Sequence, residues 1–406
     1  MRAIIQPGTA RGSVAAPPSK SMAHRLLICA GLADGVSVVR NVDRSEDVLA
    51  TADCLTALGA SLEWNGSTVR VRGCDPRKAD SAVLRCRESG STLRFMIPLC
   101  LLSGNAMRLE GSDTLLSRPL SVYEDLCRKQ ELTLLRKNGG LLVKGRLISG
   151  EYTVPGGISS QFISGLLFAL PFLSGNSRIR LIPPVESRSY LSLTLQALRD
   201  AGVSAAWTDE HTLTVPGNAF YRPLDTEVEG DCSNAAFFEA LNCTGGSVTV
   251  TGLREDSLQG DRVYRDHLAR LEKGPAEIDL TDCPDLAPVL FAAAALCRGA
   301  VFTGTRRLRF KESDRGAAMA QEMAKFGVVL GLEENRITVP AAGIRTPSGP
   351  LDSHNDHRIA MALSLLCTRT GGEIRCAEAV RKSFPDYWDR LCSLGISVTL
   401  SPDPEK

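Results

Sequence analysis

The sequence predicts an α/β protein of two domains, in which apolar helices lie inside and strands lie outside. The length of 406 residues suffices for about two domains. Hydrophobic residues make up 43% of the chain and aromatic residues only 5%, which is typical of helices and strands packed with Leu, Val, Ala and Ile. One sequence pattern also recurs six times along the chain.

The repeated pattern is a short polar start, an apolar helix, a Gly-containing break and a strand. The six copies begin at Pro18, Ser89, Ser159, Asp231, Asp285 and Asn355, and the fourth and fifth lie closer together than the others. Segments such as FMIPLCLLSG and VLFAAAALC have no polar face, so their helices belong in the interior. The strands alternate and are rich in Val, Ile and Thr, which predicts sheets with one buried face.

A second helix, with one polar face, follows each copy and is expected nearer to solvent. These helices are predicted near residues 47–58, 119–128, 190–200, 261–271, 313–326 and 384–394. Four of them end at a glycine in the position of a helix C-cap, namely Gly59, Gly202, Gly327 and Gly395. A further strand is expected after each of these helices.

Six copies form two groups of three, which predicts the domain boundary. We expect one domain over residues 20–227 and a second formed by residues 1–19 together with 228–406. The leading strand, residues 1–6, is expected to pair within the second half. The two crossings near 17–20 and 226–230 would act as a hinge, and a protein of this kind can close on a ligand.

Composition argues against several classes of protein. The formal net charge of +1 argues against a nucleic-acid-binding protein, which usually has a basic face. The 13 cysteines include no C-x-x-C pair and no His/Cys ligand spacing, so we expect buried free thiols and no metal. No apolar run reaches the roughly 18 residues of a membrane span and no signal-like segment is present, so we expect a cytoplasmic protein without a membrane partner.

Basic side chains occur in the polar turns at which helices start. Helix N-termini attract anions, and Lys and Arg add charge-assisted bonds to phosphate and carboxylate. The eight candidates are Lys20, Arg25, Arg94, Arg118, Lys311, Arg315, Arg358 and Lys382. Any one of them alone is more commonly a salt-bridged or solvated side chain. Together they predict a closed site for phosphorylated and carboxylated small molecules.

Seven short motifs carry a family resemblance. They are the segments 18–21 (PSKS), 90–94 (GSTLR), 117–119 (SRP), 159–161 (SSQ), 311–315 (KESDR), 355–358 (NDHR) and 382–387 (KSFPDY). In this order and spacing the chain resembles the 5-enolpyruvylshikimate-3-phosphate synthase family of enolpyruvyl transferases over essentially its whole length. The resemblance implies two inside-out domains, each of three βαβαββ units with buried helices.

The resemblance also implies a reaction. The enolpyruvyl group of phosphoenolpyruvate would pass to the 5-hydroxyl of shikimate-3-phosphate through a tetrahedral intermediate in the cleft between two domains. Phosphate would leave, as one step of the shikimate pathway of aromatic amino acid biosynthesis. A cytoplasmic monomer without a cofactor is expected, and glyphosate is the expected inhibitor.

Site residues follow from the matching motifs. Shikimate-3-phosphate binding is implied for Lys20, Ser21, Arg25, Ser159, Ser160, Gln161, Ser187, Asp285 and Lys311. Phosphoenolpyruvate binding is implied for Lys20, Gly90, Arg118, Gln161, Arg315, Arg358 and Lys382. Among the catalytic candidates, Asp285 is preferred as the base, and Glu312 as the group that exchanges the methylene proton, together with Lys20; the sequence leaves this division open. His24 and His267 are interpreted as structural.

Departures from the family pattern leave alternatives. Arg307 stands where the family often has Asn, Glu88 where Asn is common, and Phe95 where Pro is frequent, so the response to glyphosate stays open. The nearest rival is the sister transferase that acts on UDP-N-acetylglucosamine, but segment 111–117 has no Cys. A cyclase of RNA 3′-phosphate ends, a non-catalytic phosphometabolite-binding protein and a nucleic-acid binder are the remaining alternatives.

Overall fold

The computed structural model describes residues 1–403 in two compact units. Pro18–Glu229 form one of them, here called the central unit. Met1–Pro17 and Gly230–Lys406 form the other, here called the terminal unit. Each unit has a hydrophobic core of its own, and each is described separately.

Three four-stranded sheets make up the strands of the central unit. Their orders are β14-β3-β5-β4, β6-β7-β9-β8 and β10-β11-β13-β12. The bounds are β3 (Val36–Arg40), β4 (Ser61–Asn65), β5 (Thr68–Arg72), β14 (Asp225–Glu227), β6 (Val83–Arg85), β7 (Met107–Glu110), β8 (Thr133–Lys137), β9 (Gly140–Lys144), β10 (Glu151–Pro155), β11 (Ser177–Ile182), β12 (Ala206–Trp207) and β13 (Thr212–Val215). In every sheet the first pair of strands is parallel and the other two pairs are antiparallel.

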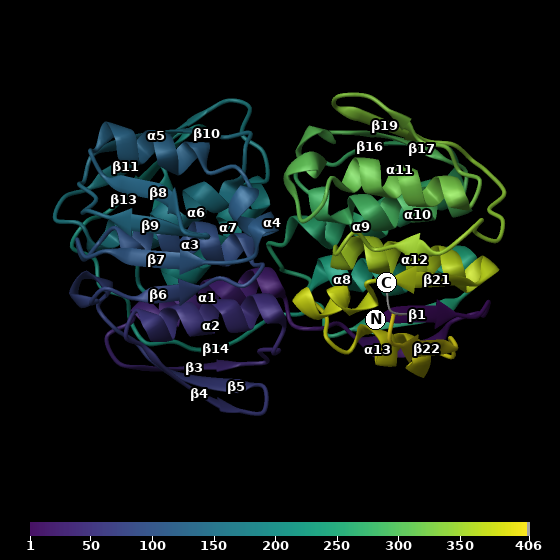
Figure 1. Ribbon diagram of the computed structural model, residues 1–406, viewed down its shortest axis with the longest axis horizontal. Helices are drawn as coiled ribbons and strands as arrows, with labels where there is room; N and C mark the ends of the chain where they lie inside the picture. The colour runs from purple at the N-terminus through teal and green to yellow at the C-terminus, as the bar shows by residue number, and fades with distance from the viewer. Residues whose placement is uncertain (404–406) are drawn as a thin grey trace. The chain divides into compact units, whose positions relative to one another are not determined.

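Apolar helices fill the interior of the central unit. They are α1 (Lys20–Leu32), α3 (Gly90–Cys100) and α6 (Ser160–Ala169), and nearly all of their residues are buried. The helices α2 (Glu46–Ala57), α5 (Ser121–Lys129) and α7 (Arg188–Asp200) alternate buried and exposed positions, and α4 (Asp113–Ser117) is a short turn of helix. Figure 1 shows α1 and α2 lying over the sheet that contains β3, β4 and β5.

The terminal unit repeats this plan with one difference. Two of its sheets have four strands, β16-β17-β19-β18 and β20-β21-β1-β22, but the third contains only β15 and β2. The bounds are β1 (Arg2–Ile5), β2 (Arg11–Ala15), β15 (Ser247–Thr251), β16 (Ala276–Asp279), β17 (Ala300–Thr303), β18 (Gly331–Leu332), β19 (Arg336–Val339), β20 (Leu351–Asp352), β21 (Gly372–Arg375) and β22 (Val398–Ser401). The short spacing between the fourth and fifth copies leaves no chain for another hairpin.

The buried helices of the terminal unit are α8 (Cys232–Glu239), α10 (Ala287–Leu296) and α12 (His357–Thr370). Its outer helices are α9 (Tyr264–Lys273), α11 (Arg315–Lys325) and α13 (Tyr387–Ser393). The predicted helix at 261–271 begins later than expected, because Gly260–Val263 form a 3-10 turn first. The leading strand β1 pairs with β21 and β22, so its predicted pairing within the second half is confirmed.

The predicted α/β class with inside-out packing is confirmed. Helix α10 shows the reason. Its side chains are almost all Ala, Val, Leu and Phe, so burial of every face stabilises it. Gly59, Gly202, Gly327 and Gly395 have φ of 111°, 82°, 87° and 91°. These values lie in the region open to glycine, so the four predicted C-caps are confirmed.

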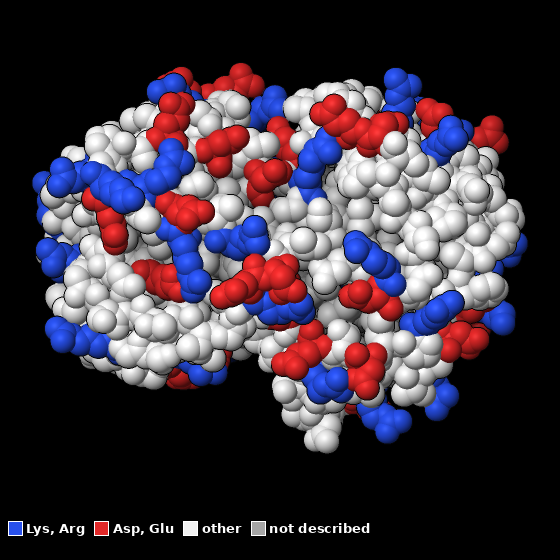
Figure 2. All heavy atoms as spheres, turned by 180° about the vertical axis from the view of Figure 1, so that it is seen from behind, with Lys and Arg blue, Asp and Glu red and all other residues white. Residues whose placement is uncertain are grey.

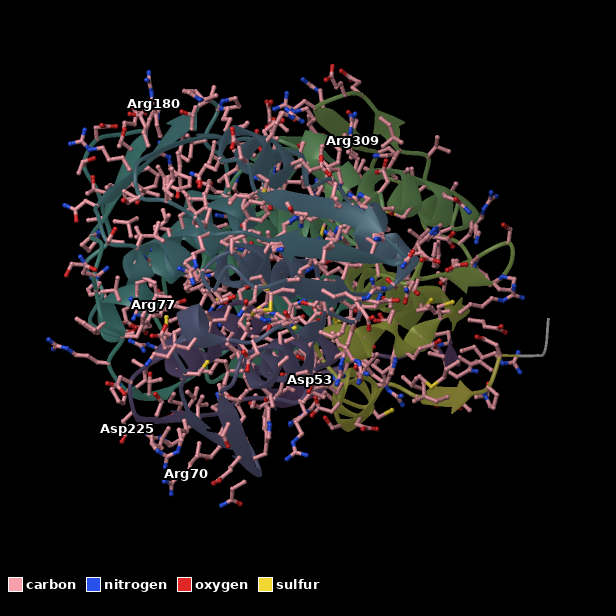
Figure 3. All side chains as sticks on the ribbon, turned by 60° about the vertical axis from the view of Figure 1, so that its left-hand side comes forward. Asp53, Arg70, Arg77, Arg180, Asp225 and Arg309 are labelled. Carbon is pink, nitrogen blue, oxygen red and sulfur yellow. The ribbon has the colours of Figure 1, made fainter. Side chains whose placement is uncertain are left out.

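Surface charges of both signs are interspersed over the face shown in Figure 2. In Figure 3 the labelled Arg70, Arg180 and Asp225 point outward from the ribbon, and all three are exposed. All 13 cysteines are free, but Cys392 is exposed and four others are half-buried, so the expectation of uniformly buried thiols was wrong. No helix within residues 1–403 combines the length and apolarity of a membrane span.

Candidate active site

The start of α1 is held in the central unit by Arg25. Its Nε donates to Thr194 Oγ1 at 2.8 Å, its Nη1 to the Ser21 carbonyl at 2.6 Å and its Nη2 to the Tyr190 carbonyl at 3.0 Å. Burial lowers the pKa of Arg25 to about 10, so the guanidinium stays charged at neutral pH. Arg25 therefore places a fixed positive charge between α1 and the start of α7, where Ser187 lies.

Ser187 has an unusual backbone. Its φ and ψ are 55° and 45°, in the left-handed region that a residue with a Cβ seldom adopts, and its side chain is buried. Tyr190 donates its backbone N–H to the Ser187 carbonyl at 3.2 Å. Such strain persists only where the surroundings fix the backbone, which is typical of binding sites.

A second cation joins α3 to α6. Arg94 Nη1 donates to Gln161 Oε1 at 2.6 Å, and the guanidinium lies 5.1 Å from the centre of the Phe162 ring. Ser159 caps α6 by accepting from the Gln161 backbone N–H at 3.3 Å, and the next residue, Ser160, is buried. This places the Ser159, Ser160 and Gln161 side chains at a helix N-terminus, where an anion is favoured.

Gly90 lies at the start of α3 with no space for a side chain. A Cβ on Gly90 would lie 2.4 Å from Arg118 Nη1. Ser89 caps the helix through its Oγ, which accepts from the Thr92 backbone N–H at 3.3 Å. The guanidinium of Arg118 thus lies directly beside the free N–H groups of a helix start.

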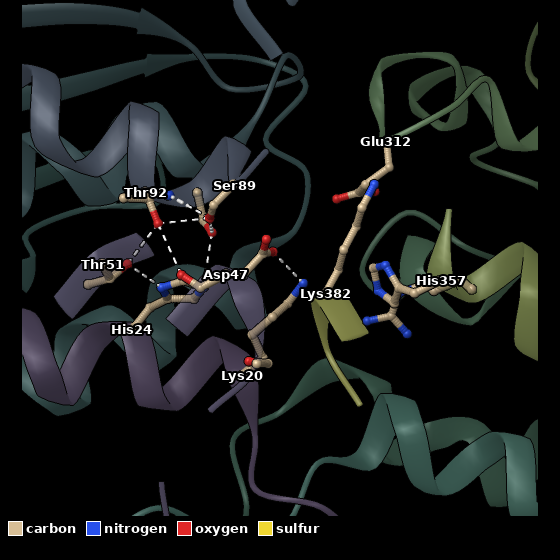
Figure 4. Close-up of polar contacts among 12 residues, drawn as sticks. Lys20, His24, Asp47, Thr51, Ser89, Thr92, Glu312, His357 and Lys382 are labelled. Atoms are coloured by element: carbon tan, nitrogen blue, oxygen red, sulfur yellow. Dashed lines mark hydrogen bonds and ion pairs between the residues drawn. The ribbon is translucent and has the colours of Figure 1, made fainter. Parts of the chain in front are cut away.

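Lys20 pairs with a carboxylate on a different helix. Its Nζ lies 2.9 Å from Asp47 Oδ2, with the two side chains 13% and 9% exposed (Figure 4). Asp47 begins the predicted second helix, but nothing in the sequence connects it to Lys20. We call the residues Lys20, Ser21, Arg25, Gly90, Arg118, Ser159, Ser160, Gln161 and Ser187 the central cluster.

Arg315, at the start of α11, organises the terminal unit. Its guanidinium contacts three carboxylates: Asp285 Oδ1 at 2.7 Å, Glu312 Oε2 at 2.6 Å and Asp356 Oδ2 at 2.8 Å. The Arg315 side chain is 1% exposed and that of Asp356 is fully buried. Negative partners raise the pKa of Arg315 further, although burial alone would lower it.

Asp285 forms ion pairs with three cations. Besides Arg315, Lys311 Nζ lies 3.0 Å from Asp285 Oδ1 and Arg358 Nη2 lies 3.3 Å from Oδ2. Burial raises the pKa of Asp285, but the charges of Arg358, Lys311 and Arg315 outweigh burial and hold it well below the usual range of a carboxyl. Asp285 is therefore an ionised carboxylate, the form that accepts a proton.

Lys311 has a cationic neighbour in Arg307, the position at which the sequence departs from the expected Asn. Burial lowers the pKa of Lys311, Asp285 raises it, and the charges of Arg315 and Arg307 lower it again, with a net shift downward. Arg307 is itself buried in the 3-10 turn Arg306–Phe310. The departure at Arg307 therefore adds positive charge beside Lys311.

Lys382 reaches the loop that precedes α12. Its Nζ donates to the Asn355 carbonyl at 2.6 Å. The next residue, Asp356, caps α12 by accepting from the Arg358 backbone N–H at 2.9 Å. We call the side chains of Asp285, Lys311, Glu312, Arg315, Arg358 and Lys382 the terminal cluster.

In the terminal unit, ion pairs join Asp285, Lys311, Arg315, Glu312 and Arg358. In the central unit, the predicted residues lie mainly at the starts of α1, α3, α6 and α7. Sequence reasoning missed Asp47, Thr194 and Asp356 as direct partners of Lys20, Arg25 and Arg315. No local sequence pattern marks these three pairs. In each pair, the cation and its partner lie on different helices or helix starts and meet only through tertiary packing. Across residues 1–403, no group of His, Cys, Asp and Glu side chains is arranged to hold a metal ion.

Inside-out α/β units with basic side chains at helix starts are the arrangement expected of the enolpyruvyl transferase class. The sequence model of the family described as EPSP synthase (3-phosphoshikimate 1-carboxyvinyltransferase) matches residues 4–391. The chain belongs to this family and is a transferase.

Curated relatives agree over nearly the full length. The 3-phosphoshikimate 1-carboxyvinyltransferase of Clostridium kluyveri is 38% identical, with 96% of each chain covered. That of Clostridium perfringens strain SM101 is also 38% identical, over 97% of this chain and 98% of the relative. A solved EPSP synthase from Acinetobacter baumannii superposes with a TM-score of 0.78 at 22% identity, covering 98% of this chain and 100% of the other, which shows the shared fold.

Proposed function

We propose that the chain transfers the enolpyruvyl group of phosphoenolpyruvate to the 5-hydroxyl of shikimate-3-phosphate and releases phosphate. The observation that carries this proposal is the set of cations around Asp285, with Lys311 and Arg315 at 3.0 and 2.7 Å. A carboxylate that accepts a proton while adjacent cations bind anionic substrates is what this reaction requires. The family membership supports the same assignment.

The chemistry has two steps. In the first, the 5-hydroxyl oxygen attacks C2 of phosphoenolpyruvate and loses its proton while the methylene carbon gains one, which gives a tetrahedral intermediate. In the second, the C–O bond to phosphate breaks and the new methyl group loses a proton, which restores the double bond. One proton acceptor and one proton donor are needed in each step.

We assign the acceptor for the hydroxyl proton to Asp285 and the exchange at the methylene carbon to Glu312, with Lys20 as a further donor. In the free enzyme Asp285 is a weak base, because its cations lower its pKa. Substrate phosphate and carboxylate groups would compete for the same cations. Their binding would therefore raise the pKa of Asp285 and strengthen it as a base.

The anion-binding residues divide between the substrates. We assign shikimate-3-phosphate to Ser21, Arg25, Ser159, Ser160, Ser187, Asp285 and Lys311, and phosphoenolpyruvate to Gly90, Arg118, Arg315, Arg358 and Lys382; Lys20 and Gln161 contact both. The fixed guanidinium of Arg25 and the helix start at Ser159 and Ser160 suit a phosphate group. No cofactor enters this mechanism.

Two domains with a hinge are part of the proposal. Residues 20–227 would form one, and residues 1–19 with 228–406 the other. Two backbone bonds support a hinge at these crossings: Ser19 N–H donates to the Glu229 carbonyl at 2.7 Å, and Asp231 N–H to the Pro17 carbonyl at 2.8 Å. From the family we further propose a cytoplasmic monomer, which size-exclusion chromatography would test.

The test is phosphate release from phosphoenolpyruvate by purified protein. Release that requires shikimate-3-phosphate, and that falls at least about a hundredfold in Asp285→Ala, would support the proposal. Release with UDP-N-acetylglucosamine instead would assign the chain to the sister transferase. No release with either acceptor would leave a binding protein. Competitive inhibition by glyphosate against phosphoenolpyruvate is expected, and a millimolar inhibition constant would contradict it.

A further inference from the structure

Five side chains of the central unit form a closed ring of hydrogen bonds, most of which Figure 4 draws. His24 Nδ1 lies 2.7 Å from Thr51 Oγ1, which lies 2.7 Å from Thr92 Oγ1. Thr92 Oγ1 donates to Ser89 Oγ at 2.8 Å, and Ser89 Oγ lies 3.2 Å from Ser91 Oγ. The ring closes where Ser91 Oγ lies 3.1 Å from His24 Nε2.

The proton count of this ring is complete when His24 is neutral. Each hydroxyl has one proton to donate, and a neutral imidazole donates from one nitrogen and accepts at the other. Thr92 Oγ1 lies 2.8 Å from Ser89 Oγ and 3.4 Å from the Asp47 carbonyl, so its one proton goes to the nearer acceptor, Ser89. The bonds then run in one direction, from His24 Nδ1–H through Thr51, Thr92, Ser89 and Ser91 to His24 Nε2. A second proton on the imidazole would make Nε2 a donor, so Ser91 Oγ would accept from both Ser89 and His24, and its own proton would have no partner within the ring.

His24 is indeed held neutral. Burial, followed by the positive charges of Lys20 and Arg25, lowers its pKa well below the ordinary value of a histidine. The imidazole is 1% exposed, and Thr51 is fully buried. The ring is therefore intact throughout the neutral pH range.

The position of the ring connects it to the central cluster. Ser89 and Ser91 flank Gly90 at the start of α3, where a Cβ would collide with Arg118. His24 lies on α1, which carries Lys20 and Arg25, and Thr51 lies on α2, which carries the Lys20 partner Asp47. The ring thus ties the Gly90 turn to the helices that carry the other anion-binding groups.

We propose that His24 is a positioning residue that fixes the Gly90–Ser91 turn for the phosphoenolpyruvate anion. His24 acts through Ser91 and exchanges no proton with a substrate. Without the ring, the Ser91 hydroxyl and the N–H groups at the start of α3 would have to be ordered at each binding event, which weakens binding. The inference rests on the proposed function.

Two variants open the ring at different points. His24→Phe removes both bonds of the imidazole while keeping a planar ring beside Phe95, whose ring centre lies 6.3 Å away. Thr51→Val removes a hydroxyl that lies one bond further from Gly90. We expect each to raise the KM for phosphoenolpyruvate about five- to tenfold, because the Gly90–Ser91 turn loses order equivalent to about one neutral hydrogen bond. The KM for shikimate-3-phosphate, kcat and the pH profile of kcat should stay within about twofold.

Two amide substitutions of His24 distinguish the hydrogen bond to Ser91 from the hydrogen bond to Thr51. The amide of His24→Gln lies near the position of Nε2 and can still reach Ser91, whereas that of His24→Asn lies near Nδ1 and can reach only Thr51. If the bond to Ser91 positions the turn, Gln retains more affinity for phosphoenolpyruvate than Asn does. Equal losses in both variants would overturn the assignment of the Ser91 bond.

Tyr221→Phe is the matched control. It removes one buried hydrogen bond from the same unit, between Tyr221 Oη and the Phe168 carbonyl at 2.8 Å. It should lower the melting temperature without changing either KM. A change of kcat alone in His24→Phe, or equal changes in both KM values, would overturn the inference. Wild-type protein without transferase activity would instead reject the proposed function, so the two failures are distinguishable.

Discussion

Gly90 and Arg118 approach so closely that a Cβ on Gly90 would lie 2.4 Å from Nη1 and 2.9 Å from Cζ of the guanidinium. Arg118 directly follows α4 as its C-cap, and its guanidinium reaches the start of α3 through the length of its side chain. The pair combines one charge with the free N–H groups of a helix N-terminus. An added methyl group must push the arginine aside, because the backbone of α3 is buried.

Gly90→Ala is therefore predicted to act on phosphoenolpyruvate. We expect its KM for phosphoenolpyruvate to rise about tenfold, since one charge-assisted hydrogen bond is weakened. The KM for shikimate-3-phosphate should change little. Steady-state kinetics with each substrate varied in turn measures both. Gly343→Ala is the control, because a Cβ there meets no atom within 4 Å; unaltered kinetics in Gly90→Ala would contradict the prediction.

Arg315→Lys tests the three-carboxylate arrangement. An ammonium carries its three donors on a single nitrogen, so it cannot reproduce the separate positions of Nη1, Nη2 and Nε that contact Asp285, Glu312 and Asp356. We expect kcat/KM to fall at least about a hundredfold and the free energy of unfolding to fall about 3 kcal/mol, as for other broken buried ion pairs. Urea unfolding and phosphate release measure the two effects.

The matched control is Arg265→Lys. Arg265 also bonds a carboxylate through two nitrogens, with distances of 3.0 and 2.6 Å to Glu239, but its side chain is 54% exposed. We expect a loss of about 0–1 kcal/mol and no change in activity. Similar losses of unfolding free energy in both lysine variants would contradict the prediction, because they would show that burial of the Arg315 contacts adds no stability.

Asp285→Asn is predicted to change how stability depends on pH. The folded pKa of Asp285 lies below the unfolded value of about 3.9. Its ionisation therefore stabilises the fold above that pH, and this contribution is lost as pH falls through the folded pKa. The wild type should consequently lose more stability than the variant between pH 6 and pH 3, as measured by urea unfolding. Asp225→Asn, which removes an exposed carboxylate, is the control; parallel curves would contradict the prediction.

Local sequence signals predicted the elements of the fold. Apolar segments such as residues 289–297 predicted buried helices, because a helix without a polar face is stable only in the interior. Gly202 and Gly327 predicted helix ends because few other residues tolerate their φ. Helix starts were displaced by a few residues where tertiary contacts decide them, as at Tyr264.

The partners of the charged residues could not be predicted in this way. Lys20 and Asp47 are 27 positions apart, and their contact depends on how α1 packs on α2. The low pKa of Asp285 arises from Arg358, Lys311 and Arg315, and these cations come from two segments of the chain that are both distant from Asp285. Motifs could thus name the members of each cluster, while the bonds and charge states within a cluster required coordinates.

His354→Gln should weaken the terminal unit at pH 6 and much less at pH 9. His354 Nε2 lies 3.1 Å from Glu322 Oε1, and Glu322 is fully buried. This bond raises the pKa of His354 above the ordinary value; burial and Lys325 oppose the rise, and Asp352 adds to it. The stabilisation is therefore present below about pH 6.5 and lost as pH rises through the folded pKa. We expect a loss of about 1 kcal/mol at pH 6, measured by urea unfolding.

His267→Gln should show the opposite trend, because burial lowers the pKa of His267 and its protonation destabilises the fold at low pH. A pH-independent loss in His354→Gln would mean that the imidazole only fills space beside Glu322.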